Sequence, residues 1–291
     1  MGSFRIKGGK KLSGEIQPQG AKNEALQIIS AVLLTDQDVE INNVPDIRDV
    51  NRLIDLLKGL GVRVEKLEDN KFVFNAANIK IENIYSKDYY KNASSIRGSV
   101  MLLGPMIARF GKGFLPQPGG DKIGRRRLDT HFTGLEKLGA QFEYNESQQS
   151  YYIKAEELKG AHMLLEEASV TGTANILMAA VLAEGETTIF NAACEPYLVQ
   201  LSKMLNRMGA NINGIGSNLL KVRGVKKLNG TTHTMLADMI EVGSFIGMAA
   251  VTKSEISIKG VKLADLGLIP DVFRRLGVKL EQRGEDIFIP Q

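Results

Sequence analysis

The chain is poor in the residues that build disulfides, metal clusters and aromatic binding surfaces. Its 291 residues include one cysteine, three histidines and no tryptophan, and aromatic residues make up 6%. The single Cys194 excludes an internal disulfide and a metal site made of several cysteines. The histidines, at 131, 162 and 233, show none of the short spacings typical of paired metal ligands. We therefore expect neither a bound metal nor a cofactor.

Long apolar runs are missing as well. The N-terminal MGSFRIKGGKK has no apolar stretch of the kind that a signal peptide requires. No uninterrupted apolar run reaches the roughly 18 residues that a transmembrane helix needs. Hydrophobic residues make up 43% of the chain and charged residues 24%, which is ordinary for a globular protein. These features predict a soluble, cytoplasmic protein without a membrane partner.

Positive charge gathers in one loop. The chain has a net charge of +4 and a pI near 9.0, which suits anionic ligands without requiring them. The stretch LPQPGGDKIGRRRLDTH, residues 115–131, contains three consecutive arginines. Nucleic acid, a phosphorylated small molecule and plain solvation are the alternatives for this loop. Elsewhere the basic residues are mixed with acids, so the dense basic stripe of a nucleic-acid-binding protein is missing.

A repeat organises the chain. Four segments end in a similar way, LLKGLGVRV, LEKLGAQF, LNRMGANI and FRRLGVKL, and their glycines, Gly61, Gly139, Gly209 and Gly277, lie about 70 residues apart. Each glycine follows an amphipathic helix, where it is typical of a helix C-cap. A hairpin comes next, as in VRVEKLEDNKFVFNA. The repeated unit therefore reads strand–helix–strand–helix–strand–strand.

The other helix of each unit is nearly apolar all round. These helices are expected within 23–35, 99–111, 174–185 and 244–252, and their composition predicts that they are buried. They begin with polar clusters, namely GAKNEAL, SSIRGS, SVTGTAN and ADMIEVGS. Helix N-termini attract anions, so convergence of these starts would create a phosphate-binding cavity.

Several residues are candidates for that cavity, and each has a structural alternative. Lys22 opens an otherwise buried helix, which favours function over a solvated surface lysine. Arg97 taken alone is equally compatible with either role. The backbone of 169–173 offers N–H groups. Not all of Arg125, Arg126 and Arg127 need be functional, because exposed arginines commonly face water.

Several motifs together resemble those of a known family. GAKNEAL at 20–26, NVPDIRDV at 43–50, PGGDKIGRRRLDTH at 118–131 and AAVLAEGETTIFNAACEP at 179–196 are similar to the UDP-N-acetylglucosamine 1-carboxyvinyltransferases. The resemblance runs along the whole chain. It implies the inside-out α/β barrel of the enolpyruvyl transferase type, six βαβαββ units in two lobes. Four units are present here, giving a complete lobe at 22–229 and a partial one formed by 1–21 and 230–291.

The resemblance also implies roles for individual residues. Asp121, Lys22 and Arg126 match catalytic positions, with Lys22 and Arg126 holding the phosphate of phosphoenolpyruvate. Matching positions imply substrate contacts for Asn23, Arg48, Asp49, Arg97, Asp129, Ser169, Val170 and Thr171. The reaction implied is attack of the sugar 3-hydroxyl on C2 of phosphoenolpyruvate, protonation at C3 and expulsion of phosphate. It needs no cofactor and no metal.

Two departures from the family pattern follow. Asp121 stands where many members have a cysteine, so we expect a carboxyl proton donor and resistance to fosfomycin, which forms a thioether with that thiol. The family's last two units, with a proposed base and a further arginine, have no counterpart here. We therefore expect a truncated chain that could self-associate through an exposed edge. A related acceptor, or UDP-sugar binding without catalysis, remain the alternatives.

Overall fold

The computed structural model describes residues 3–120, 124 and 127–291. The chain forms two compact units, Lys22–Met235 and a smaller unit made of Met1–Ala21 and Leu236–Gln291. The boundary expected at residue 229 falls before β12 (Thr231–Thr234). Because β12 pairs in parallel with β2 (Asp38–Asn42), the residues up to Met235 belong to the larger unit.

The third repeat shows the repeating unit in one continuous stretch. It runs through β8 (His162–Leu164), α6 (Val170–Ala180), β9 (Glu186–Phe190), α7 (Pro196–Arg207), β10 (Asn211–Asn213) and β11 (Leu219–Arg223). β8 and β9 are parallel neighbours joined through α6, and the sheet order is β10-β11-β9-β8. The βαβαββ unit expected from the sequence is confirmed here.

The first and fourth repeats exchange their first strands. β1 (Ser13–Ile16) precedes α1 (Lys22–Ala31) in the chain but pairs with β13 (Glu255–Ile258). β12 precedes α8 (Met239–Thr252) but pairs with β2. Both pairs are parallel, like β8 beside β9. The unit pattern is therefore kept in both sheets, although each takes one strand from elsewhere in the chain.

The remaining elements of the larger unit complete two more sheets. The first repeat continues with the 3-10 helix Val32–Leu34, α2 (Arg48–Gly59), β3 (Arg63–Glu68) and β4 (Lys71–Asn75), in a sheet of order β12-β2-β4-β3. The second contains the 3-10 helices Ile81–Tyr85 and η3 (Arg97–Leu102), with α3 (Lys87–Ala93), α4 (Leu103–Phe110), β5 (Lys112–Pro116), α5 (Asp129–Lys137), β6 (Gln141–Asn145) and β7 (Ser150–Lys154). Its sheet has the order β5-β7-β6.

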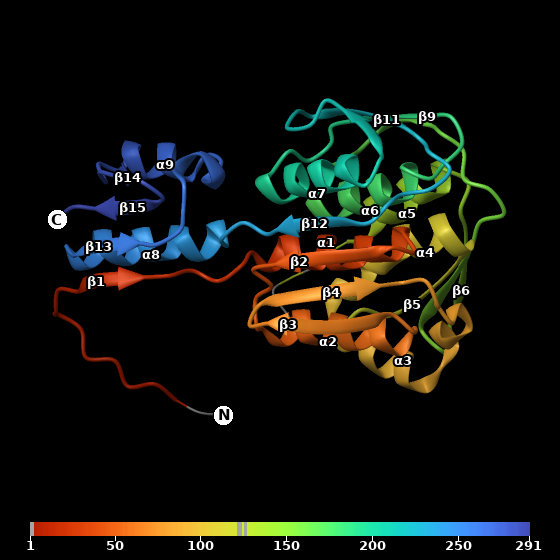
Figure 1. Cartoon of the computed structure of the whole chain (residues 1–291), viewed down its shortest axis with the longest axis horizontal. Helices are drawn as coiled ribbons and strands as arrows, with labels where there is room; N and C mark the ends of the chain where they lie inside the picture. The colour runs from red at the N-terminus through yellow and green to blue at the C-terminus, as the bar shows by residue number, and fades with distance from the viewer. Residues whose placement is uncertain (1–2, 121–123, 125–126) are drawn as a thin grey trace. The chain divides into compact units, whose positions relative to one another are not determined.

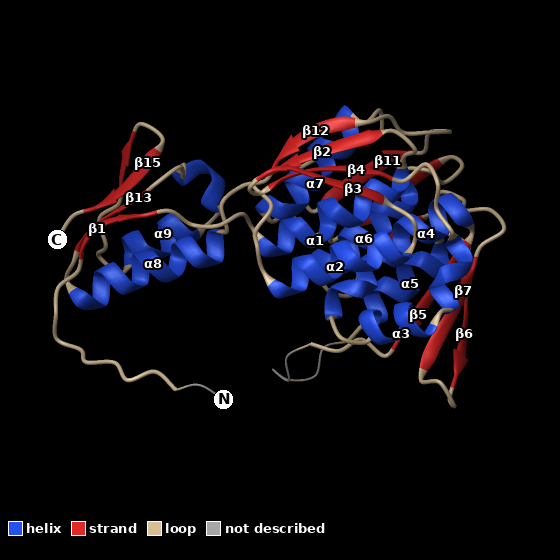
Figure 2. Cartoon of the chain, turned by 60° about the horizontal axis from the view of Figure 1, so that its bottom comes forward, coloured by secondary structure: helices blue, strands red, loops and turns tan. Residues whose placement is uncertain are grey.

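Helices form the centre of the larger unit and strands cover its outside. Figure 2 shows α1, α4 and α6 enclosed by the sheets, and both α1 and α4 contact α6. Nine of the eleven residues of α6, Gly172–Ala180, are buried. The buried helices expected within 23–35, 99–111 and 174–185 are thus confirmed, and their apolar side chains make the core.

The four marker glycines end their helices in the left-handed conformation. Gly61, Gly139, Gly209 and Gly277 have φ angles of 99°, 108°, 104° and 83°. A Cβ at Gly61 would also lie 2.7 Å from the carbonyl oxygen of Asn78. Both the backbone angle and the close approach require glycine there, as the repeat pattern predicted.

The smaller unit packs helices against one sheet. It contains β1, α8, β13, the 3-10 helix Leu263–Leu266, α9 (Ile269–Arg275), β14 (Glu281–Arg283) and β15 (Asp286–Ile289), in the sheet order β1-β13-β15-β14 (Figure 1). Only Val242, Ile246 and Ala249 of α8 are buried, whereas the side chain of Val251 is 82% exposed. The expectation that this fourth apolar helix is buried is therefore wrong, because only one of its faces packs on the sheet.

Membrane insertion through a helix has no candidate among the described residues. None of the helices there combines the length and the hydropathy that a span requires.

Candidate functional site

The first turns of α1 and α2 bring a lysine and a carboxylate together. The Nζ of Lys22, the first residue of α1, lies 2.8 Å from Oδ2 of Asp49, the second residue of α2. Both side chains are about two-fifths exposed, so the pair borders solvent. Asn23 is half-buried beside it, and Arg48 is exposed at the first position of α2. Two helix starts and a lysine thus offer positive potential to an anion.

Arg97 lies beside both described sides of the glycine- and arginine-rich loop. Its Nη2 donates to the carbonyl oxygen of Arg127 at 3.2 Å. A Cβ on Gly120 would lie 3.2 Å from the Cβ of Arg97, and one on Gly119 would lie 2.2 Å from the carbonyl oxygen of Ser94. The two glycines therefore let the loop backbone pass directly over 94–97, which is more than the simple chain turn that such a pair usually provides.

The starts of α5 and α6 are joined by a buried histidine. His131 is 2% exposed, and its Nε2 lies 3.1 Å from Oγ1 of Thr171 in the first turn of α6. Asn175 Nδ2 lies 3.0 Å from Nδ1 of the same ring and also donates to the carbonyl oxygen of Val100. Asn175 Oδ1 accepts from the backbone N–H of Gly104 at 2.6 Å. One amide therefore links α5, α6, η3 and α4.

The His131 ring is neutral. Burial, assisted by the nearby Arg97 cation, lowers the pKa of His131 to about 3. Because Asn175 Nδ2 can only donate, Nδ1 accepts, and the ring proton sits on Nε2 facing Thr171. The ring thus acts as an uncharged spacer that orients the first turn of α6.

The expected diphosphate contacts cluster at these starts. Ser169 caps α6 by accepting from the N–H of Gly172 at 3.1 Å, which leaves the N–H groups of Val170 and Thr171 in the first turn, where helix geometry provides no internal partner. Asp129 opens α5 and lies 3.8 Å from Nε of Arg127, with both side chains about two-thirds exposed. The N-cap of α5 is Leu128, so Asp129 does not cap the helix.

Contacts between elements show that these starts lie close together. A Cβ on Gly98, next to Arg97, would lie 2.9 Å from Cδ2 of Leu26 in α1. A Cβ on Gly172 would lie 2.7 Å from Cγ2 of Thr130 in α5. The structure therefore brings together the first turns of α1 and η3, and those of α5 and α6, as the polar helix starts suggested. Asp121 and Arg126 lie outside the described residues.

Among the described residues, no three side chains of His, Cys, Asp or Glu gather in a way that could hold a metal ion. The site itself combines the cations Lys22 and Arg97 with helix N-termini, which are groups that bind anions, and with the carboxylates of Asp49 and Asp129.

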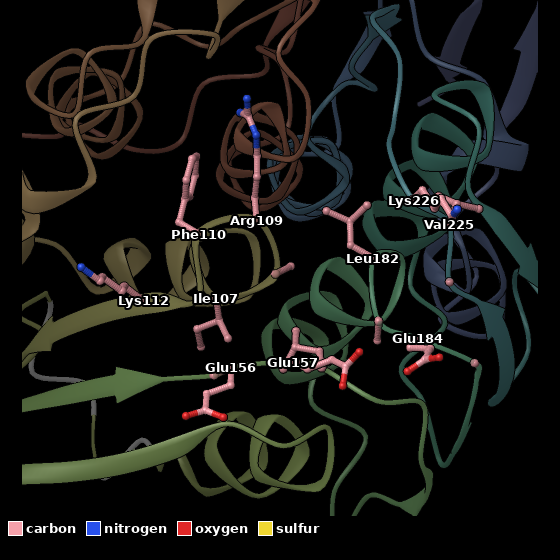
Figure 3. Close-up of a pocket in the computed structure, with 17 residues that line it drawn as sticks. Ile107, Arg109, Phe110, Lys112, Glu156, Glu157, Leu182, Glu184, Val225 and Lys226 are labelled. Carbon is pink, nitrogen blue, oxygen red and sulfur yellow. The ribbon is translucent and has the colours of Figure 1, made fainter.

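A cavity of about 780 Å³ lies at the C-terminal ends of α4 and α6, away from the helix starts. Figure 3 shows Arg109, Lys112, Glu157 and Glu184 around it. Arg109 does not serve a ligand there, because its Nη1 donates to the carbonyl oxygens of Leu33, Thr35 and Ala76 at 2.8–3.0 Å. With mixed charges and helix C-termini, this cavity lacks the anion-binding character of the helix starts.

One polar cluster escaped the sequence analysis. Glu24, two residues after Lys22, is fully buried and lies 2.8 Å from Nε2 of His233. Arg207 Nη2 lies 2.6 Å from Nδ1 of that ring. The available signal was an acidic residue inside an apolar helix, which costs free energy unless it is paired.

Comparison with known proteins assigns the family. A family model described as EPSP synthase (3-phosphoshikimate 1-carboxyvinyltransferase) matches residues 6–290. The UDP-N-acetylglucosamine 1-carboxyvinyltransferase of Bacteroides fragilis is 66% identical over 290 residues, covering 100% of this chain and 67% of that protein. The protein of the same name from Porphyromonas gingivalis is 60% identical over 291 residues, again covering 67% of its length. The chain belongs to the UDP-N-acetylglucosamine 1-carboxyvinyltransferase family.

Solved structures confirm the enolpyruvyl transferase fold. The enolpyruvyl transferase NikO from Streptomyces tendae matches with a TM-score of 0.84 at 19% identity, over 98% of this chain and 67% of that one. EPSP synthase from Acinetobacter baumannii matches with a TM-score of 0.72 at 19% identity, over 97% and 65%. At this identity the likeness concerns the fold alone.

Proposed function

We propose that this protein transfers the enolpyruvyl group of phosphoenolpyruvate to the 3-hydroxyl of UDP-N-acetylglucosamine and releases phosphate, in the first committed step of peptidoglycan synthesis. The observation that carries the proposal is the 60–66% identity, over the whole chain, to enzymes named for that reaction. We place the reaction in the cytoplasm, because a single cysteine suits a reducing compartment.

Lys22 is the residue to which we assign the phosphate of phosphoenolpyruvate. It sits at a helix start, and Asp49 holds its ammonium 2.8 Å away at the border with solvent. A phosphate dianion arriving there gains a charge-assisted hydrogen bond and the favourable end of the α1 dipole. Arg126 is the second cation of this assignment, with Arg48 beside Asp49 supporting it.

The sugar nucleotide occupies the starts of η3, α5 and α6 in this proposal. The backbone N–H groups of Val170 and Thr171 suit a diphosphate, as helix N-termini commonly do. Arg97 supplies a cation next to the loop, and Asp129 supplies an acceptor for hydroxyl or imide groups. Asn23 lies between the two regions and is assigned to the sugar.

The chemistry requires charge stabilisation and exclusion of water. The 3-hydroxyl loses its proton as its oxygen bonds to C2, and C3 takes up a proton, which gives a tetrahedral adduct. Phosphate then leaves from C2 while C3 loses a proton, which restores the C2–C3 double bond of the enolpyruvyl product. Lys22 and Arg126 stabilise the departing phosphate. Asp121 is the assigned proton donor, since a carboxyl in a closed site can remain protonated near neutral pH.

A different acceptor is the alternative within the same fold. The matching family model is described for 3-phosphoshikimate, but the solved EPSP synthase is only 19% identical. The identity of 60–66% to the UDP-N-acetylglucosamine 1-carboxyvinyltransferases is much higher, and it favours the UDP-sugar as the acceptor. Phosphate release from phosphoenolpyruvate, measured with each acceptor in turn, separates them.

The test uses the 291-residue chain and two matched variants. We expect UDP-N-acetylglucosamine to stimulate phosphate release, and Lys22→Met to abolish it. Lys66→Met is the control, because Lys66 forms a pair of the same 2.8 Å length with Asp69 on the β3–β4 hairpin. Stimulation by 3-phosphoshikimate instead would overturn the proposal. Binding of the UDP-sugar by calorimetry without phosphate release would show that these 291 residues bind the acceptor but do not complete the transfer.

A further inference from the structure

Three side chains, of which Glu24 and His233 are buried and Arg207 is exposed, form a triad that ties α1 to two other elements of the larger unit. Glu24 belongs to the first turn of α1, His233 to β12 and Arg207 to the last turn of α7. Figure 1 shows these three elements side by side. Glu24 and His233 have exposed fractions of 0% and 2%.

The direction of each hydrogen bond follows from what the groups can donate. The guanidinium of Arg207 has only donors, so Nδ1 of His233, 2.6 Å away, is the acceptor. The proton of the neutral ring is then on Nε2, which donates to Oε1 of Glu24 at 2.8 Å. The His233 ring therefore lies between the Arg207 guanidinium and the Glu24 carboxylate and makes a hydrogen bond with each.

A triad of this kind is not expected to stabilise the fold more than apolar side chains would. Removing the Glu24 carboxylate from water costs several kcal/mol, and an apolar side chain of similar volume commonly stabilises a fold as well as a buried charge that is paired. Glu24 sits on a helix whose other buried residues include Ala25, Ile28 and Ile29, so an apolar residue would suit the packing. Stability alone therefore does not explain the triad, and positioning of the first turn of α1 is the alternative.

Its position supplies that role. Successive helix residues are rotated by about 100°, so Lys22 and Glu24 lie about 200° apart around α1, on nearly opposite faces. Asp49 of α2 holds one face through Lys22, and His233 holds the other through Glu24. The first turn of α1 is thus fixed from both sides.

We propose that Glu24, His233 and Arg207 are positioning residues that hold the first turn of α1, and with it Lys22 and Asn23, in the geometry that binds the phosphate of phosphoenolpyruvate. The inference rests on the proposed function for the identity of the anion. The triad itself touches no substrate and acts only through the helix backbone.

The test separates positioning from stability. In a triple variant, Glu24→Leu, His233→Phe and Arg207→Met, apolar side chains replace all three members of the triad together. We expect its urea midpoint to stay close to that of the parent chain. We expect its Kd for phosphoenolpyruvate, measured by calorimetry without an acceptor so that no turnover takes place, to rise about 10- to 100-fold, because small misplacements of binding groups are costly.

Two single variants complete the design. Arg207→Lys keeps a cationic donor, so its Kd for phosphoenolpyruvate should stay at the parent value. Arg109→Met removes an arginine of the same unit that binds Leu33 O and Thr35 O, just beyond the other end of α1. It should lower the urea midpoint but leave the Kd unchanged. The positioning role would be refuted if the triple variant kept the parent Kd for phosphoenolpyruvate. It would also be refuted if Arg109→Met raised that Kd as much as the triple variant does.

A second readout needs no ligand. The rate at which an amine-acylating reagent modifies Lys22, followed by peptide mass spectrometry, reports how firmly Asp49 holds its ammonium. We expect the triple variant to accelerate acylation of Lys22 several-fold and leave Lys66 unchanged. An unchanged Lys22 rate counts against the inference. Failure of the parent chain to bind phosphoenolpyruvate would instead count against the proposed function, with the acylation result still deciding the inference.

Discussion

Acidification should destabilise the protein through one buried imidazole. The folded pKa of His131 is lowered to about 3 by burial, from about 6.5 in an unfolded chain. A group with a lowered folded pKa binds its proton preferentially in the unfolded state. Its contribution to stability is therefore complete above pH 6.5 and is lost as the pH falls from 6.5 toward about 3.

The magnitude follows from linkage. Between pH 7 and 5.5 the free energy of unfolding should fall by about 1 kcal/mol on account of this residue, and by about 2–3 kcal/mol at pH 4.5. The first figure depends almost entirely on the unfolded pKa, because at pH 5.5 the folded ring is still neutral.

Urea unfolding at several pH values, in parent and variant, measures this difference. His131→Gln should be less stable at pH 7 but should show a flatter pH dependence by about 1 kcal/mol between pH 7 and 5.5. The other titratable groups are the same in both proteins and cancel in the comparison. His162→Gln replaces an exposed imidazole and should keep the parent slope. Parallel pH curves for the parent and His131→Gln would refute the reasoning.

Three further substitutions test the site by different routes. Asn175→Leu leaves the N–H of Gly104 and two acceptors unpaired in the core, so urea unfolding should show a loss of about 3–5 kcal/mol. Gly119→Ala should fold but bind UDP-N-acetylglucosamine at least about tenfold more weakly in calorimetry, because its Cβ meets the carbonyl oxygen of Ser94; Gly59→Ala, with open space around it, is the control. Preincubation with fosfomycin should leave the parent chain active and inactivate Asp121→Cys, since only a thiol forms the thioether; an insensitive cysteine variant would contradict this.

The repeat could be predicted because its signals are local. A glycine with positive φ after an amphipathic helix is visible in any single segment, and all four marker glycines adopt that conformation. The polar starts of otherwise apolar helices were equally visible, and they led to Lys22, Arg97 and the 169–171 segment. These predictions needed only helix geometry and hydrophobic periodicity.

Features set by long-range partner choice could not be predicted. The exchange of β1 and β12 depends on which of several similar strands fits beside β2 or β13, and no local pattern distinguishes them. Only the family resemblance grouped 1–21 with 230–291, and it assigned β12 to the wrong unit. The triad joins residues 24, 207 and 233. The acidic residue inside an apolar helix indicates that Glu24 needs a partner, but nothing local in the sequence identifies His233 or Arg207 as that partner. The exposure of α8 was missed because an apolar composition does not say how many faces find a partner.

The larger unit separates stability from binding along single helices. In α6 the segment Ala174–Ala180 contributes to the buried core, whereas Ser169–Thr171, at its start, supplies polar groups and N–H donors. Asn175 lies at the junction and links the two parts through His131. Substitutions beyond this junction should therefore lower stability first, and those before it should weaken anion binding first. α1 follows the same plan, with Lys22 before its junction and Glu24 at it, which is why a buried carboxylate stands where an apolar residue would otherwise suffice.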